Sequence, residues 1–458
     1  MKALPKSIFA AFLVSMALLA PTLARAETDI ARLSLQMFSV QGEAKRPIVE
    51  KLVATGERSL IPTFVLAMRW TGDNKYVAKA LSDLTETEIK TWHEAYEWQE
   101  LNPQIIPHES YRALKMRFLG NTDRNFLDFF KDPYGKRERM KIRLEEISWG
   151  GVLVDVGIPS LDNPPMIDAK DADYLVDDDL VFGVEINGDV RAYPLRIMGW
   201  HEMFNDTIGG VPVALAYCTL CGAGILFETK VEGRDAPFVF ATSGLLYRSN
   251  KLMFDRETRS LWNQFTGEPV VGPLVDSDIK LKIHPNTITS WANWKAKHPR
   301  SKVLSIDTGF IRNYASGFIY REYFASPDLM FPAVVGDESQ IKRKEYVFGI
   351  QQAGAAKAWP VEAFRDRRVI NDTVGGVDVV LIGDAVTRTV RAYEREAGEV
   401  FNEDKAGELE TPGESWAVTE TFLVSSDQKH KRVRVPGHVS YWFAWNNYHG
   451  VKSELYSD

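Results

Sequence analysis

Asn205-Asp-Thr-Ile-Gly-Gly-Val211 recurs further along the chain as Asn371-Asp-Thr-Val-Gly-Gly-Val377. Two more segments recur at the same offset without a gap: Val181-Phe-Gly-Val184 returns as Val347-Phe-Gly-Ile350, and Arg191-Ala-Tyr-Pro-Leu195 returns as Lys357-Ala-Trp-Pro-Val361. Ordered matches at one spacing indicate an internal repeat. We therefore expect a tandem-duplicated domain whose two copies pack with pseudo-two-fold symmetry.

Each copy has the texture of a β-rich domain. From Ile147 onward the sequence consists of short apolar runs broken by Gly, Pro, Asn and Asp. The runs 181–186 and 190–194 flank Asn187-Gly188, a dipeptide typical of a two-residue hairpin turn. Helices are expected to be few. The fold class is therefore α+β, with a first repeat over 147–310 and a second repeat over 311–458.

The region before the repeats, 27–146, has the pattern of a small α-helical module. Apolar residues recur there at three- and four-residue spacing, as in the run 60–68. Thr85-Glu-Thr-Glu88 resembles a capping box that opens a further helix over 89–98. Short helices separated by polar turns predict a set of helical hairpins, a scaffold that carries no evident chemistry.

The first 26 residues have the organisation of a secretory signal peptide. Lys2 and Lys6 precede an apolar run over 8–20, and Ala24-Arg25-Ala26 supplies a small-x-small cleavage site. The run is short for a membrane anchor. We expect cleavage after Ala26 and a periplasmic or secreted protein. No later segment is long and apolar enough to cross a bilayer, so no membrane span is expected in the mature chain.

The bulk composition narrows the class of partner. The chain has 458 residues, a formal net charge of −7 and 45% hydrophobic residues. This length and composition provide ample core for more than one domain. The negative charge is unfavourable for binding nucleic acid. The sequence has no basic cluster of the kind that would indicate binding to a membrane surface. The expected partner is a redox protein of unknown identity or a small ligand.

Cys218 and Cys221 are the only cysteines in the chain. They lie in Tyr217-Cys-Thr-Leu-Cys-Gly222, at the end of an expected strand and before another, so we predict a strand–turn–strand arrangement. Opposite them in the second repeat stands Gly383-Asp-Ala-Val-Thr387, which has no cysteine. Residues shared by both repeats are best interpreted as scaffold, and features of the first repeat alone as candidates for function.

Three interpretations of the cysteine pair remain open. The pair is a redox-active dithiol, a metal site for zinc or copper, or a static disulfide that braces the turn. A metal would need His201 beside the two thiolates, and one more ligand such as Glu202 or Asp255. Gly222 stands where covalent haem attachment would require histidine, so that use is excluded.

Four further residues are candidates for the same site. His201 is replaced by Arg367 in the second repeat, and as a base near neutral pH it would deprotonate one of the thiols. Asp255, Arg256 and Tyr247 lie in polar stretches that belong only to the first repeat, and we expect them to bind substrate. The plainer alternative is that Asp255-Arg256 forms a turn with a local ion pair. Motifs for phosphate loops, nucleophile elbows and zinc proteases are missing from the sequence.

The region from about 150 to 455 resembles the bacterial family catalogued as domain of unknown function 3179. The motifs that carry the resemblance are Arg191-Ala-Tyr-Pro-Leu195, Trp200-His-Glu202, Asn205-Asp-Thr-Ile-Gly-Gly-Val-Pro-Val213, Tyr217-Cys-Thr-Leu-Cys-Gly222, Ser243-Gly-Leu-Leu-Tyr247, Asp255-Arg256, Ser260-Leu-Trp262, Gly272-Pro273 and Trp442-Phe-Ala-Trp445. The resemblance implies no particular activity.

From the residues we predict an exported thiol–disulfide redox protein that uses Cys218 and Cys221. In the alternatives, the chain binds a metal or small ligand without turnover, or serves as an interaction scaffold with a structural disulfide.

Overall fold

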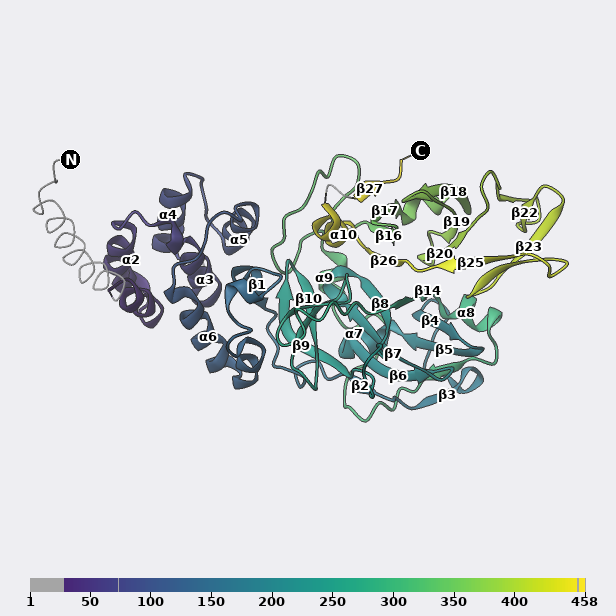
Figure 1. The fold of residues 1–458 in the computed structure, drawn as a ribbon, viewed down its shortest axis with the longest axis horizontal. Helices are drawn as coiled ribbons and strands as arrows, with labels where there is room; N and C mark the ends of the chain where they lie inside the picture. The colour runs from purple at the N-terminus through teal and green to yellow at the C-terminus, as the bar shows by residue number, and fades with distance from the viewer. Residues whose placement is uncertain (1–28, 73, 451–452, 458) are drawn as a thin grey trace, which may run out of the picture. The chain divides into compact units, whose positions relative to one another are not determined.

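The computed structural model describes residues 29–72, 74–450 and 453–457. The chain separates into two compact units, Met1–Asn121 and Thr122–Asp458. The expected signal peptide lies outside the described residues. Overall the protein is a mixed α+β structure, in which a helical region is followed by β-rich sheets (Figure 1).

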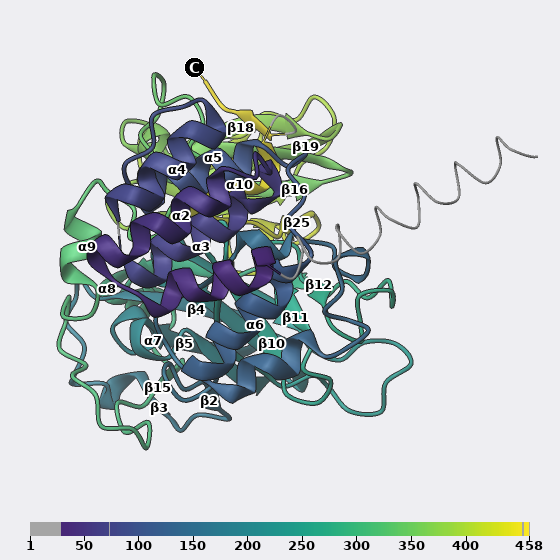
Figure 2. The same ribbon diagram turned by 90° about the vertical axis from the view of Figure 1, so that its left-hand side faces the viewer.

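The first unit is built from helices that lie side by side (Figure 2). Its helical segments are 29–39, α2 (Arg46–Val53), α3 (Ile61–Thr71), α4 (Lys75–Thr85), α5 (Trp92–Leu101) and α6 (Ser110–Thr122). The centre is α3, which is buried along most of its length. The capping box predicted at 85–88 was placed wrongly, because Thr85 ends α4. The box is formed by Thr91 and Glu94 at the start of α5.

Among the described residues, every helix is too short or too polar to span a lipid bilayer.

The second unit begins with three five-stranded sheets. The first has the order β1 (Ile147–Trp149), β9 (Phe240–Tyr247), β10 (Asn250–Asp255), β11 (Leu261–Asn263) and β12 (Glu268–Val271). The second has the order β13 (Ile283–His284), β8 (Ala223–Glu228), β7 (Val211–Cys218), β6 (Met203–Ile208) and β2 (Leu161–Asp162). The third has the order β14 (Thr287–Ser290), β4 (Leu180–Ile186), β5 (Asp189–Pro194), β15 (Lys302–Leu304) and β3 (Met166–Asp168). The helices α7 (Leu195–His201) and α8 (Trp291–Lys297) follow β5 and β14.

Two more sheets follow in the last part of the chain. One has the order β26 (His438–Tyr441), β16 (Tyr346–Gln352), β17 (Ala355–Pro360) and β27 (Ser453–Leu455). The other has the order β18 (Val369–Val374), β19 (Val377–Asp384), β20 (Thr389–Glu394), β25 (Lys431–Val435), β24 (Phe422–Ser425), β23 (Glu414–Val418), β22 (Leu409–Thr411) and β21 (Asn402–Glu403). Helix α10 (Trp442–His449) follows β26. We call 147–304 the first half, 346–457 the second half, and the segment 305–345 between them, which contains α9 (Arg321–Ala325), the strap.

The two halves share a pattern of strand pairing. The hairpin β4–β5 pairs with β14 on one side and runs parallel to β15 on the other. The hairpin β16–β17 pairs with β26 on one side and runs parallel to β27 on the other. The β4–β5 turn is the one predicted from Asn187-Gly188, and both residues have the positive φ that a tight hairpin needs, 51° and 81°.

Glycine opposite tryptophan explains one of the repeated motifs. A Cβ on Gly183 would lie 2.0 Å from the Trp294 ring, and a Cβ on Gly349 would lie 2.1 Å from the Trp445 ring. The Val-Phe-Gly segments therefore carry glycine so that the helix of each half can bury an indole against the hairpin. Both tryptophans are fully buried.

One hydrophobic core joins the halves. A single cluster of buried side chains includes Phe182, Phe204 and Leu215 from the first half, and Phe348 and Trp359 from the second. The cysteine-bearing strand β7 runs through this core. The site is therefore held on a rigid framework.

Candidate thiol site

The two cysteines lie on a tight connection between β7 and β8. Cys218 is the last residue of β7, a short 3₁₀ turn spans Thr219–Cys221, and Gly222 has a positive φ of 60° before β8 begins. This confirms the predicted strand–turn–strand arrangement. Gly222 also gives room to the second half, because a Cβ there would lie 2.9 Å from the Tyr346 ring.

The sulfur atoms of Cys218 and Cys221 are 3.0 Å apart, and both residues are free thiols. Their exposed fractions are 2% and 0%. Gln264 fastens the connection from behind, since its side-chain amide donates to the carbonyls of Ala216 and Ala223 at 2.7 and 2.9 Å. The pair is therefore close enough for thiol chemistry between its members, but it is covered.

The Cys221 thiol faces two oxygen acceptors. Its sulfur lies 3.5 Å from the Ser249 carbonyl and 3.3 Å from the Asn250 side-chain oxygen. Burial is the main reason that the pKa of Cys221 is raised well above its usual value, and the neighbouring Cys218 adds to the effect. Cys221 is thus held as the protonated thiol.

The turn that contacts Cys221 has a backbone conformation unusual for its sequence. Arg248 and Ser249 join β9 to β10, and both have positive φ, 50° and 62°. This two-residue hairpin conformation normally uses Asn or Gly. Left-handed backbone at other residues is typically strained by about 1–3 kcal/mol and tends to mark functional positions. Here the conformation brings the Ser249 carbonyl and Asn250 to the thiol.

A buried ion pair lies beside the thiols. Lys251 Nζ is 3.3 Å from a Glu202 carboxylate oxygen, and both side chains are almost entirely buried. The same ammonium donates to the main-chain carbonyls of Glu202 and Tyr217 at 3.0 and 3.4 Å. The Thr219 hydroxyl, between the two cysteines in sequence, donates to the other Glu202 oxygen at 2.7 Å. Glu202 therefore connects directly to the cysteine turn.

His201 is occupied by other partners. Its Nδ1 lies 2.7 Å from the Pro159 carbonyl, and its Nε2 lies 2.6 Å from the Tyr314 hydroxyl. Burial lowers the pKa of His201, so the neutral ring donates from Nδ1 and accepts at Nε2. Within the described part of the chain, no hydrogen bond joins His201 to either thiol. The contacts give His201 a visible role as an anchor for the strap.

Asp255 and Arg256 form local structural contacts. The Asp255 carboxylate accepts from the Thr258 backbone, the Thr258 hydroxyl and the Trp262 indole at 2.6, 2.7 and 2.9 Å. Arg256 pairs with Asp155 at 3.1 Å and also contacts Asp162. These contacts agree with the alternative given by the sequence, in which Asp255 and Arg256 form a turn with ion pairs. Their assignment to substrate stays a prediction.

Tyr247 is the last residue of β9, next to the strained turn. Its main-chain carbonyl accepts from the Tyr448 hydroxyl of α10 at 2.8 Å, and the Arg248 guanidinium lies 5.1 Å from its ring centre. Tyr247 therefore belongs to the contact between the two halves beside Cys221. Its assignment to substrate is likewise still a prediction.

The strap covers the cysteine turn, and sequence reasoning missed its tyrosines. The Tyr323 hydroxyl donates to the Leu220 carbonyl, between the cysteines, at 2.6 Å. Tyr320 lies beside Thr219, and burial is the main cause of its raised pKa. Lys344 holds the end of the strap, with its ammonium 3.7 Å from the centre of the Tyr323 ring. A concentration of tyrosines in a segment without a counterpart in the other half was the available signal.

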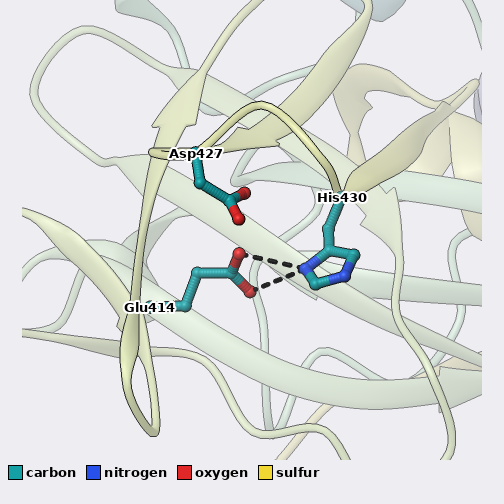
Figure 3. Close-up of side chains that lie close together, drawn as sticks. All are labelled: Glu414, Asp427 and His430. Atoms are coloured by element: carbon teal, nitrogen blue, oxygen red, sulfur yellow. Dashed lines mark hydrogen bonds and ion pairs between the residues drawn. The ribbon is translucent and has the colours of Figure 1, made fainter.

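A separate cluster of possible metal ligands lies far along the chain, in the β23–β25 region. Figure 3 shows the His430 imidazole facing the Glu414 carboxylate, at 3.0 and 3.2 Å from its oxygens, with Asp427 turned towards the same space. Asp427 already accepts from Ser425 and from the Lys429 backbone. These contacts, the Lys429 backbone first, lower its pKa. The three side chains therefore already have hydrogen-bond partners within this surface region.

The alternative metal set of Cys218, Cys221 and His201 is not assembled in the same way. Among the described residues, Glu414, Asp427 and His430 are the one group of three whose ligand atoms lie within 4.8 Å of one another. A metal at the thiols would therefore require His201 to leave Pro159 and Tyr314.

The family resemblance is confirmed by the comparisons. Residues 155–451 match the model of the family described as protein of unknown function (DUF3179), and the chain belongs to this family. Neither the search of curated proteins nor the search of solved structures found a match.

Proposed function

We propose that Cys218 and Cys221 form a thiol–disulfide redox centre. The observation that carries the proposal is the 3.0 Å separation of two free thiols on a rigid turn, beside a buried acid–base pair. A structural thiol needs no ionisable neighbours, whereas thiol exchange needs a group to take the proton. We favour redox chemistry over metal binding because His201, the third ligand that a metal would need, is hydrogen-bonded to Pro159 and Tyr314.

In the proposed reaction, Cys218 is the attacking residue. Its thiolate attacks one sulfur of a partner disulfide, forms a mixed disulfide and releases one partner thiolate. Cys221 then loses its proton and attacks Cys218, closing the protein disulfide and releasing the second partner thiolate. Two electrons pass to the partner, which takes up two protons. Cys221 is given the resolving role because its thiol is fully buried and faces two acceptors.

We propose Glu202 as the proton acceptor. Its carboxylate bonds to Thr219 within the turn and pairs with Lys251, whose positive charge favours a thiolate nearby. The sequence-based prediction that His201 is the base remains open to test. His201→Gln should loosen the strap, because His201 bonds to Tyr314. If Glu202 takes the proton, this variant should leave the pH dependence of the thiol reaction unchanged.

Trapping the mixed disulfide tests this mechanism. Cys221→Ser keeps Cys218 and should form one adduct with oxidised glutathione, visible as a single mass increase in the intact protein. Cys218→Ser keeps the buried Cys221 and should react far more slowly, and the double variant is the blank. Equal rates in the two single variants would contradict the assigned roles. Stoichiometric zinc or copper in wild-type protein, lost in both variants, would instead support the metal alternative.

The proposed setting is an oxidising compartment outside the cytoplasm. The expected leader 1–26 supports export, and two nearby thiols in such a compartment would exchange between oxidised and reduced forms with a partner. Sequencing the N-terminus of protein recovered from an expressing bacterium should give Glu27. Recovery of chains that begin at Met1 would remove this part of the proposal.

We also propose that the two halves are a tandem duplication with pseudo-two-fold symmetry. The matching pairing of β4–β5 and β16–β17, and the two glycine–tryptophan contacts, support it. The thiol site is then an addition to one copy of a common scaffold.

A further inference from the structure

The β19–β20 connection is the second half's counterpart of the cysteine turn. Cys218 pairs with Ala223 at the end of β7–β8, and Asp384 pairs with Thr389 at the end of β19–β20. In the first half the turn is covered by the strap. In the second half it opens onto a cavity of about 810 Å³. That volume is within the usual range for binding sites of small organic molecules.

The cavity is lined by both halves. Helix α8 contributes Trp294 and Lys297, and the second half contributes Arg368, Arg391 and Trp416. Asp384 and Glu408 also line it. The Asp384 carboxylate accepts from the Val386 backbone and the Thr387 hydroxyl at 2.9 and 2.6 Å, so both its oxygens are engaged by its own turn. Lys297 of α8 and Arg391 of β20 supply cationic groups to the lining, and Asp384 and Glu408 supply carboxylates.

The cationic groups of α8 and β20 share one buried carboxylate. The buried carboxylate of Glu420 is shared by Arg391 at 2.7 Å, Lys297 at 3.2 Å and Arg434 at 3.3 Å. Three cationic side chains thus surround one anion. Burial opposes the ionisation of Glu420, but these cations, Arg391 foremost, hold its pKa well below the usual value. Glu420 therefore stays charged, and the three cations around it outnumber it.

Donor groups remain for a ligand. Arg391 uses Nε and Nη2 on Glu420, and within the described residues its Nη1 has no hydrogen-bond partner. Arg368, nearer the solvent, uses Nη1 on Glu403 and on the Gly407 carbonyl. Burial lowers the pKa of Lys297, and its ion pair with Glu420 opposes that shift. Guanidinium and ammonium donors together fit the oxygen atoms of a carboxylate or phosphate.

We propose that this cavity binds a small organic oxyanion, with a carboxylate or phosphate group against Arg391 and Lys297. The site is separate from the thiols and does not depend on their chemistry. Trp294, Ile382, Leu409 and Trp416 are the apolar residues of the lining that the rest of the molecule would meet. Binding would bridge α8 of the first half and β20 of the second, so the ligand would stiffen the joint between the halves.

The test is calorimetric titration of the purified protein at low salt with citrate, inorganic phosphate and neutral glucose as separate probes. We expect saturable one-to-one binding of citrate or phosphate and none of glucose, with affinity that falls as sodium chloride is added. Binding of citrate alone would identify a carboxylate ligand, and binding of phosphate alone would identify a phosphate ligand.

Three charge-removing variants locate the site. Lys297→Gln and Arg368→Gln line the cavity and should each weaken binding about tenfold. Arg365→Gln removes the same charge from an exposed guanidinium that pairs with Glu362 away from the cavity lining, and should leave affinity unchanged. Lys297 and Arg368 are partly exposed, so their replacement should preserve folding, as circular dichroism would verify. No saturable binding of either anion, or equal weakening by Arg365→Gln, would overturn the proposal.

Discussion

The cysteine turn of the first half and the Asp384–Thr389 connection of the second half end equivalent hairpins but meet different surroundings. Around the cysteines, the β9–β10 turn and the strap close the space, and the Glu202–Lys251 pair is joined to the cysteine turn through the Thr219 hydroxyl. Around Asp384 the space stays open as a cavity lined by cationic and acidic side chains, with Arg391 and Lys297 on one side. The difference shows that the surroundings of each turn are determined by what is packed onto the sheet, because the strands that carry the two turns are paired alike.

The largest effect is expected from breaking the ion pair that only the first half has. Glu202→Gln leaves the Lys251 ammonium buried without its carboxylate. Loss of one partner of a buried pair typically lowers the free energy of unfolding by about 3–5 kcal/mol. Urea denaturation followed by fluorescence would measure it.

An exposed pair is the matched control for this prediction. Asp168→Asn breaks the contact between Lys302 and Asp168, whose side chains are about half exposed, and should lower the free energy of unfolding far less than Glu202→Gln does, because solvent screens an exposed pair. Similar losses for Glu202→Gln and Asp168→Asn would show that the pair beside the thiols is effectively solvated.

A second difference between the halves should appear in acid. His438 of the second half occupies the position opposite Gly349 that Thr287 occupies opposite Gly183. Burial lowers the pKa of His438 to about 3, with a smaller contribution from His449, whose own pKa burial lowers to about 4. The folded state therefore binds fewer protons than the unfolded state. The stability that these neutral histidines contribute is fully present above about pH 6.5. Below that pH the free energy of unfolding falls by at most about 1.4 kcal/mol per pH unit for each histidine.

Replacing the buried histidine by its first-half counterpart isolates this effect. His438→Thr should flatten the loss of unfolding free energy measured between pH 6.5 and pH 4.5. His430→Thr, which makes the same replacement at an exposed histidine that pairs with Glu414, serves as the comparison. An acid slope that persists in full after His438→Thr would assign it to other groups.

A smaller effect should be shared by both halves. Gly183→Ala and Gly349→Ala each place a Cβ about 2 Å from a buried indole ring, at 2.0 and 2.1 Å. Overpacking of this kind typically lowers the free energy of unfolding by about 1–3 kcal/mol. Thermal denaturation should show a similar loss of unfolding free energy in the two variants. If only one substitution is harmful, the equivalence of the two glycine–tryptophan contacts would be in doubt.

The smallest effect on stability is expected at the cysteines themselves. Cys218→Ser and Cys221→Ser change one buried atom on a turn that Gln264 and Tyr323 already fasten. Closing so short a loop constrains the unfolded chain little, so oxidation should also change stability only slightly. We expect losses of about 1 kcal/mol or less by urea denaturation under reducing conditions. A large loss in either variant would favour a structural role for the pair.

Much of the scaffold could be predicted from local sequence. Asn187-Gly188 predicted the β4–β5 hairpin because only certain residues accept its backbone angles. Cys218 and Cys221 could be placed on a turn between strands because Gly222 follows them. The start of α5 was misplaced because two Thr-x-x-Glu segments compete there, and the choice depends on where the preceding helix ends.

The environment of the cysteines could not be predicted in the same way. Glu202 follows α7 and Lys251 lies on β10, and the two meet because different sheets pack together, so nothing near either residue in sequence identifies the other. His201 was assigned to the thiols because the cysteine-free repeat has Arg367 in its place and because histidine is a base near neutral pH. Its contacts are with Pro159 and with Tyr314 of the strap. The strap tyrosines carry no periodic pattern, so their position over the turn follows only from the tertiary structure.

The reduction potential of the Cys218–Cys221 pair tests the central claim most directly. The protein would be equilibrated in buffers that contain dithiothreitol or glutathione at graded ratios of the reduced to the oxidised form. Free thiols would then be alkylated and counted by mass spectrometry of the intact protein. We predict a reversible two-electron transition between about −120 and −270 mV, the range of thiol–disulfide exchange proteins. The double variant Cys218→Ser/Cys221→Ser should show no transition. A disulfide with a potential below about −300 mV, or thiols that never oxidise across the series, would contradict a redox function for this site.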